Sequence, residues 1–166
     1  KSVKCVSGRM ESLPAEGFDF SVILDFAHTP DGLSNLLSAV QGFAKGRVIA
    51  VFGCGGDRDN AKRPIMGATA AKLADFCVVT SDNPRTEDPM EILREIEEGI
   101  KETTGEYVVI ENRRDAIRHA LEIGREGDII VLCGKGHETY QETMGVKRPF
   151  DEKVVVQELL TELRGE

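Results

Sequence analysis

The sequence contains few of the residues that are typical of several classes of protein. Its 166 residues include no tryptophan, and aromatic residues make up only 5% of the chain. No apolar run approaches the ~20 residues that a membrane-spanning helix needs. Positive charge is also scarce, since 21 Lys and Arg stand against 29 Asp and Glu, for a net charge of −8. Nucleic-acid binding depends on cations that displace counterions from phosphates. We therefore expect neither a nucleic-acid partner nor a membrane partner.

The cysteines indicate neither a metal site nor a disulfide framework. Cys5, Cys54, Cys77 and Cys133 are widely separated, and no C-x-x-C pair occurs. Zinc sites and disulfide-rich domains usually show paired or regularly spaced cysteines. The first ten residues lack the apolar core of a signal peptide. We expect reduced thiols, no metal bound by this chain, and a cytoplasmic protein.

Short apolar runs alternate with helical patterns along the chain. The runs are rich in Val and Ile at consecutive positions, as in strands buried on both faces. Most helical patterns start near a polar capping residue, as at Thr29–Pro30 and Asp88–Pro89, whereas the helix around Ala61–Ala74 has a weaker pattern and is rich in Ala. This alternation predicts an α/β fold: a Rossmann-like, mostly parallel sheet of about six strands with helices on both faces. The predicted strands are Ser21–Asp25, Arg47–Phe52, Phe76–Ser81, Tyr107–Glu111 and Asp128–Leu132.

Two segments depart from the alternation. Thr139–Glu142 and Val146–Phe150 are typical of a hairpin, which we expect to form an antiparallel edge of the sheet. Cys5–Ala15 contains no such pattern and is interpreted as a connector, with a boundary near Pro14–Asp19. Residues 1–16 are therefore assigned to the tail of a preceding domain with its linker, and residues 17–166 to one domain. Since the chain begins at Lys1, we expect a longer parent protein.

Charged residues and glycines gather after the predicted strands. Open α/β sheets bind ligands beyond the carboxyl ends of their strands, so these residues are expected to share one rim. Cations there suit a phosphate or a carboxylate, which arginine pairs with bidentately. Carboxylates there suit an ammonium group or a ribose hydroxyl. An amino acid fits this mixture better than a simple phosphate ester. The cations are Arg58, Arg63, Arg85 and Lys135; the acids are Asp57, Asp82 and Glu138.

Several of these features also have structural interpretations. Gly53–Gly56 could form only a tight turn, and Asp82–Pro84 only an Asx-type turn. His28 could act at a helix start, and His137 could orient a loop. Neither a dinucleotide-binding motif nor a P-loop is present. No nucleophile–base pair is evident, so no catalytic residue is assigned to this chain.

Five ordered motifs together resemble the C-terminal domain of the Mur ligases, over nearly the whole chain. One departure is Phe26, where that family often has tyrosine. More specifically, the chain resembles the diaminopimelate-adding members of the family. The motifs are Asp25–Asp31, Phe52–Asp59, Lys62–Pro64, Asp82–Arg85 and Gly134–Glu138.

The resemblance implies ATP-dependent amide-bond formation in peptidoglycan precursor synthesis. The substrates are ATP, meso-diaminopimelate and a UDP-N-acetylmuramoyl-dipeptide, whose carboxylate is activated as an acyl phosphate. The P-loop and most of the ATP- and Mg²⁺-binding residues belong to a central domain that this chain lacks, apart from a segment at Cys5–Ser12 that resembles its last strand. We therefore expect this chain to be inactive without the N-terminal and central domains of its own polypeptide.

The resemblance also assigns residues. Arg85 is expected to pair with the far carboxylate of diaminopimelate, which lysine lacks. The expected diaminopimelate-binding residues are Arg58, Asp82, Asn83, Pro84, Arg85, Gly134 and Glu138. The expected ATP-binding residues are His28, Asp31, Arg63 and Asp82.

Two other functions stay open from the sequence. The first is a lysine-adding or other Mur or folylpolyglutamate-type ligase, against which Arg85 argues. The second is a free-standing module that binds a nucleotide or an amino acid. The segment Cys5–Ser12 argues against that module, because it resembles part of another domain. The fold alone cannot separate these functions.

Overall fold

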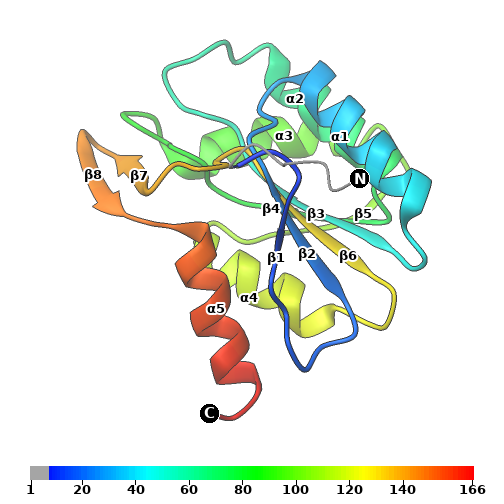
Figure 1. Cartoon of the computed structure of the whole chain (residues 1–166). Helices are drawn as coiled ribbons and strands as arrows, with labels where there is room; N and C mark the ends of the chain where they lie inside the picture. The colour runs from blue at the N-terminus through cyan, green and yellow to red at the C-terminus, as the bar shows by residue number, and fades with distance from the viewer. Residues whose placement is uncertain (1–7) are drawn as a thin grey trace.

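A six-stranded sheet forms the centre of the computed structural model, which describes residues 8–166 (Figure 1). Five strands run parallel, and the strand order is β1-β2-β6-β3-β4-β5. The predicted α/β, mostly parallel fold is confirmed. The strands are β1 (Glu11–Leu13), β2 (Ser21–Asp25), β3 (Val48–Phe52), β4 (Phe76–Val79), β5 (Glu106–Val109) and β6 (Ile129–Cys133).

Helices cover both faces of this sheet, because its central strands are apolar on both sides. In β2, Ile23 packs against one layer of helices, while Val22 and Leu24 pack against the other. Figure 1 shows the two layers on opposite sides of the strands. One layer contains α1 (Pro30–Phe43), α2 (Lys62–Leu73) and α3 (Pro89–Ile100), and the other α4 (Arg113–Ile123) and α5 (Glu152–Leu163).

The predicted capping residues fix where the helices begin. The Thr29 hydroxyl accepts a hydrogen bond from the Gly32 amide at 3.0 Å. The Asp88 carboxylate accepts one from the Met90 amide at 2.9 Å. Such bonds satisfy amides that the first helical turn leaves unpaired. The loops between the strand ends and these helices are held at one rim of the sheet as a result.

The hairpin forms as predicted, but it is not an edge of the main sheet. Strands β7 (Tyr140–Thr143) and β8 (Val146–Pro149) make a separate two-stranded sheet, which projects from the body of the molecule in Figure 1. The antiparallel edge is β1, within the segment interpreted as a connector. Three residues are too few to show a period of two, so the pattern of the sequence gives no signal for β1. The resemblance of Cys5–Ser12 to a strand pointed to this segment but assigned it to the preceding domain. Cys5 lies outside the described residues.

No helix among residues 8–166 is long and apolar enough to cross a membrane.

Candidate functional site

A cavity of about 260 Å³ lies at the carboxyl ends of the parallel strands. Loops after β2, β3, β4 and β6 surround it, as the order of the sheet requires. Of the seven residues that the sequence assigns to diaminopimelate, only Pro84 does not line it. The other six are Arg58, Asp82, Asn83, Arg85, Gly134 and Glu138.

The loops after β3 and β4 touch through their backbones at one side of this cavity. The Gly56 amide donates a hydrogen bond to the Asn83 carbonyl at 2.8 Å. A Cβ on Gly56 would lie only 1.8 Å from the Pro84 carbonyl oxygen, so no other residue fits there. Pro84 therefore supports the cavity from behind rather than lining it.

Arg85 extends its guanidinium to the cavity from a constrained backbone. Its φ of +53° lies in the left-handed region, which non-glycine residues rarely adopt. The Arg85 amide donates to the Glu142 carbonyl at 3.0 Å, and the Met144 amide donates to the Arg85 carbonyl at 2.6 Å. The Arg85 Nη1 donates to the Gly56 carbonyl at 2.8 Å, and Glu142 lies 3.9 Å from Nε. Among residues 8–166, Nη2 has no hydrogen-bond partner, so it is available to an anion.

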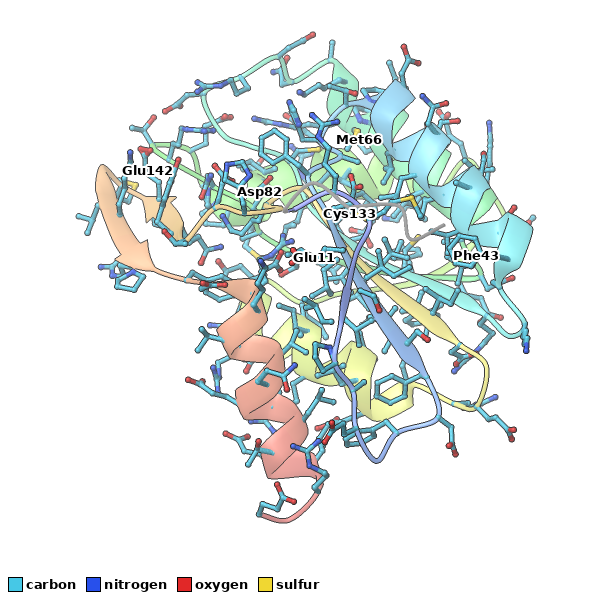
Figure 2. The ribbon with its side chains drawn as sticks, viewed as in Figure 1. Glu11, Phe43, Met66, Asp82, Cys133 and Glu142 are labelled. Atoms are coloured by element: carbon cyan, nitrogen blue, oxygen red, sulfur yellow. The ribbon has the colours of Figure 1, made fainter. Side chains whose placement is uncertain are left out.

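Carboxylates face the same space. Asp82 is 93% buried, and its Oδ1 is enclosed with no hydrogen-bond donor among the described residues. Figure 2 shows Asp82 above the strand ends, on the side toward the hairpin that carries Glu142. The Glu138 carboxylate accepts a hydrogen bond from the Tyr140 hydroxyl at 3.2 Å. The charge of Glu138, together with this bond, raises the pKa of Tyr140.

The residues assigned to ATP are not gathered in one place. His28 lines the first cavity and also a neighbouring one of about 430 Å³, which reaches Arg9 and Asn35. The two cavities share Phe26, whose ring centroid lies 4.7 Å from that of His28. Asp31 is exposed in the first turn of α1 and lines neither cavity. The sequence therefore placed His28 near the site but gave no measure of how far Asp31 lies from it.

Arg63 lies inside the protein rather than on the rim. Its side chain is 1% exposed and forms ion pairs with Glu87 at 2.6 Å and Glu95 at 2.9 Å. Its Nη2 also donates to the Gly55 carbonyl at 3.1 Å. The hydrogen bond from Arg63 is the main reason that the pKa of Glu87 lies below its usual value. In this structure Arg63 supports the glycine-rich loop, and it would have to exchange a carboxylate to contact a phosphate.

Sequence reasoning missed two groups of residues around the cavity. Arg113 is fully buried and donates to the carbonyls of Ser81 and Cys133, each at 3.0 Å, at the ends of two neighbouring loops. The hairpin holds the loop after β4 through Glu142. The position of the hairpin directly after the Gly134–Glu138 motif was the available signal for its role.

The chain offers no metal site among residues 8–166, since no three His, Cys, Asp or Glu side chains are placed to hold an ion. The described cysteines are Cys54, Cys77 and Cys133, all free and buried. Burial raises the pKa of Cys54 and of Cys77 to about 12, so neither thiol is a ready nucleophile.

An open α/β domain with a cavity at the carboxyl ends of its strands belongs to the class of doubly wound proteins, in which ligands bind at that edge of the sheet. Residues 8–136 match the model of the family described as "Mur ligase, glutamate ligase domain". The chain belongs to this family, so the resemblance seen in the sequence is confirmed.

Relatives extend this finding. The chain is 55% identical over 157 residues to the UDP-N-acetylmuramoyl-L-alanyl-D-glutamate–2,6-diaminopimelate ligase of Caldanaerobacter subterraneus subsp. tengcongensis, covering 95% of the chain and 32% of that protein. A ligase of the same name, numbered 1, from Clostridium acetobutylicum is 53% identical, with 95% and 33% covered. A solved structure of a ligase of this name has a TM-score of 0.89 at 40% identity, covering 98% of the chain and 33% of its own. The chain thus spans about a third of the length of these relatives.

Proposed function

We propose that this chain is the amino-acid-binding domain of an ATP-dependent ligase that adds meso-diaminopimelate to UDP-N-acetylmuramoyl-L-alanyl-D-glutamate. Support comes from the names of its relatives and from the charges that its cavity presents. The observation that carries the proposal is the Arg85 guanidinium, fixed at the cavity with Nη2 unpaired among residues 8–166. In this proposal the enzyme works in the cytoplasm, and residues 1–16, of which Glu11–Leu13 form the edge strand β1, lead into this domain from the one before.

The cavity matches an amino-acid end that carries both charges. Arg85 is suited to a carboxylate, and Arg58 lines the same cavity. Asp82 and Glu138 are suited to an ammonium group. Diaminopimelate carries such a pair at each end, whereas the side chain of lysine ends in an ammonium alone. Lysine would leave the Arg85 guanidinium without its anion, and an unpaired buried polar group costs binding free energy.

In the proposed reaction, this chain holds the reacting amine of the amino acid in place. In the family's chemistry, ATP converts the dipeptide carboxylate into an acyl phosphate. The free amine of the amino acid attacks the carbonyl carbon of the acyl phosphate. A C–N bond forms, the nitrogen loses a proton, and phosphate leaves as the C–O bond to it breaks. Residues of the cavity bind the far end, so that the reacting amine is oriented toward the acyl phosphate.

ATP and Mg²⁺ are proposed to be held mainly by the rest of the polypeptide. His28 and Asp31 are the residues of this chain proposed for the adenosine side, and Asp82 for the ribose. Arg63 is proposed for a phosphate only through a change in its ion pairs with Glu87 and Glu95.

The decisive experiment measures phosphate release by the full-length parent protein. It receives ATP, magnesium and the UDP-linked dipeptide, with either meso-diaminopimelate or L-lysine. A strong preference for diaminopimelate is expected. Equal or greater use of lysine would retain the ligase but overturn the proposed selectivity, and no turnover with either would favour a binding module.

A second arm of this experiment tests Arg85 directly. Arg85→Ala should raise the KM for diaminopimelate by about tenfold or more, because a charge-assisted pair is lost. Discrimination against lysine should fall with it. Arg85→Lys should recover only part of the loss, since an ammonium lacks the planar fork. Arg94→Ala is the matched control, because Arg94 is exposed on α3 and, within residues 8–166, pairs only with Glu91 and Glu98 of its own helix.

A further inference from the structure

Lys135 is a fully enclosed cation beside the cavity, with none of its side chain exposed. It follows β6 directly, and its ammonium meets three oxygens. Nζ lies 3.0 Å from Asn83 Oδ1, 2.9 Å from the Tyr140 carbonyl and 3.4 Å from Asp82 Oδ1. One side chain therefore joins the loop after β6, the loop after β4 and the first strand of the hairpin.

These contacts determine the orientation of the Asn83 amide. Its Oδ1 lies 3.0 Å from both the Lys135 ammonium and the Glu142 backbone amide. Both of these groups are donors without an acceptor, so only the oxygen of Asn83 can face them. The Asn83 NH₂ group must then point the other way. It has no partner among residues 8–166 and is not among the fully enclosed polar atoms that lack one, so it is reached from the cavity that Asn83 lines.

Lys135 also balances the charge of Asp82. Burying a carboxylate without a counter-ion is costly, and the enclosed Oδ1 of Asp82 has no hydrogen-bond donor. The ammonium at 3.4 Å supplies the opposite charge. Burial lowers the pKa of Lys135, while the neighbouring Asp82 opposes that decrease. The other oxygen, Oδ2, lies 3.0 Å from the point where a Cβ on Gly134 would sit, beside the cavity.

We propose that Lys135 is a positioning residue that sets which groups around the cavity donate and which accept. It turns the Asn83 NH₂ toward the ligand as a donor for a carboxylate. It also supplies the counter-ion beside Asp82, whose carboxylate is an acceptor for an ammonium. Lys135 itself is sealed from the cavity and acts through these two neighbours. This inference rests on the proposed function, since the ligand is the amino-acid substrate.

The test uses the full-length enzyme and the variant Lys135→Met. Its KM for diaminopimelate should rise about tenfold or more, because Asn83 and Asp82 each lose a charged partner. Its KM for ATP should rise less than about threefold, because Asp82 is the one residue proposed for ATP that Lys135 contacts, and the other groups proposed to hold ATP are unchanged. A purely structural role would instead lower the melting temperature and the active fraction while leaving both KM values alone. That result, or equal increases in both KM values, would overturn the proposal.

The matched control is Lys147→Met. Lys147 is an exposed lysine of the same hairpin, and its Nζ lies 4.6 Å from the centroid of the Tyr140 ring. Both KM values should stay at their original level. A rise in the control equal to that of Lys135→Met would mean that the hairpin, not the buried cation, is responsible.

A second variant keeps the proposal testable if Lys135→Met does not fold. Asn83→Asp retains an oxygen for Lys135 and for the Glu142 amide, changes the group that faces the cavity from donor to acceptor, and adds a negative charge beside the Lys135 ammonium. The melting temperature should be kept while the KM for diaminopimelate rises about tenfold or more. An unchanged KM would show that the NH₂ group does not face the ligand.

The two proposals fail separately. If the wild-type enzyme prefers lysine or another amino acid, the proposed function is wrong, and the Lys135 comparison is made with the amino acid it uses. If diaminopimelate is preferred and neither variant changes its KM, the proposed function stands and the role of Lys135 is wrong.

Discussion

Buried and half-buried charges fix the loops at both ends of the strands. At the carboxyl ends, Arg113 pairs with Glu152 at 2.9 Å, with both side chains fully buried. At the opposite ends, Asp128 accepts hydrogen bonds from the Arg47 side chain and backbone and from the Arg125 amide, between 2.7 and 3.1 Å. The first cluster supports the cavity, whereas the second holds the starts of β3 and β6 together. Their effects on function and on stability should therefore separate.

The Asp128 cluster makes stability depend on pH. Burial alone would raise the pKa of Asp128, but the hydrogen bonds from Arg47 and Arg125 outweigh it and hold the pKa below its usual value. A carboxylate with a lowered pKa stabilises the fold above about pH 4 and loses that effect as pH falls further. Asp128→Asn should lower the free energy of unfolding by about 1–3 kcal/mol at pH 7. Urea unfolding from pH 7 to pH 3 should show the gap to wild type narrowing below pH 4.

Asp19→Asn is the control for this measurement, because Asp19 is exposed. It should leave the stability close to wild type at each pH. A gap for Asp128→Asn that stays constant down to pH 3 would show that the carboxylate charge has no part in the effect.

At this scale the sequence identified most of the candidate residues but not their surroundings. Arg58, Asp82, Asn83, Arg85, Gly134 and Glu138 could be found because they occur in short motifs after strands. The burial of Arg63 could not be predicted, because its partners Glu87 and Glu95 lie more than twenty residues away in the chain. Local pattern does not report such pairings.

Among the elements, α2 and α3 approach more closely than side chains normally permit. A Cβ on Gly99 of α3 would lie 1.8 Å from the Pro64 carbonyl oxygen of α2. On α2, a Cβ on Gly67 would lie 2.1 Å from the Ile96 carbonyl oxygen. Glycine at both positions thus lets the two backbones touch, and α2 in turn carries Arg63 to the glycine-rich loop.

Two alanine substitutions should therefore have opposite effects on stability. Gly99→Ala should destabilise the fold by about 1–3 kcal/mol, because the added methyl group meets backbone. Gly42→Ala should stabilise it by about 0.5–1 kcal/mol, since Gly42 lies near the end of α1 with nothing within 4 Å of its Cβ position. Thermal unfolding of both variants checks the signs. Equal destabilisation would contradict this account of the helix contact.

The hairpin holds the loop Asp82–Arg85, which we propose selects the amino acid. Glu142→Pro would remove the amide that donates to Asn83 Oδ1, while Glu142→Ala keeps that amide and removes only a half-buried side chain. In the full-length enzyme, the proline variant should raise the KM for diaminopimelate about tenfold, because the Asn83 amide loses a fixed donor. The alanine variant should change it little, since long ion pairs with partial exposure contribute little. Similar KM values for the two variants would show that the backbone amide is not important.

The elements themselves were largely predictable. Continuous apolar runs marked the five parallel strands, and capping residues marked the helix starts, because both signals are local. The docking of the hairpin was not predictable, since it depends on a bridge between Arg85 and Thr143 and on bonds across nearly sixty residues. Strand β1 was missed because three residues carry no period.

At the scale of the whole molecule, the proposed function makes the chain one part of a larger active site. It spans about a third of the relatives it matches, and its described residues include no metal site. We expect the isolated chain to show no diaminopimelate-dependent ATP hydrolysis. A phosphate-release assay with ATP, magnesium and both substrates checks this, with the full-length parent as the positive control. Turnover by the chain alone would mean that the phosphate-binding groups lie within it.

The separate two-stranded sheet has a consequence for how specificity can evolve. The residues proposed to select the substrate are bonded to a small hairpin outside the six-stranded sheet, so we expect that they can be exchanged without repacking either hydrophobic layer. The loop Asp82–Arg85 and the hairpin Tyr140–Pro149 are joined by backbone hydrogen bonds and by Lys135. We therefore expect the two segments to change together when specificity changes. Transplanting both together between related ligases should transfer amino-acid preference, whereas either segment alone would arrive without its support.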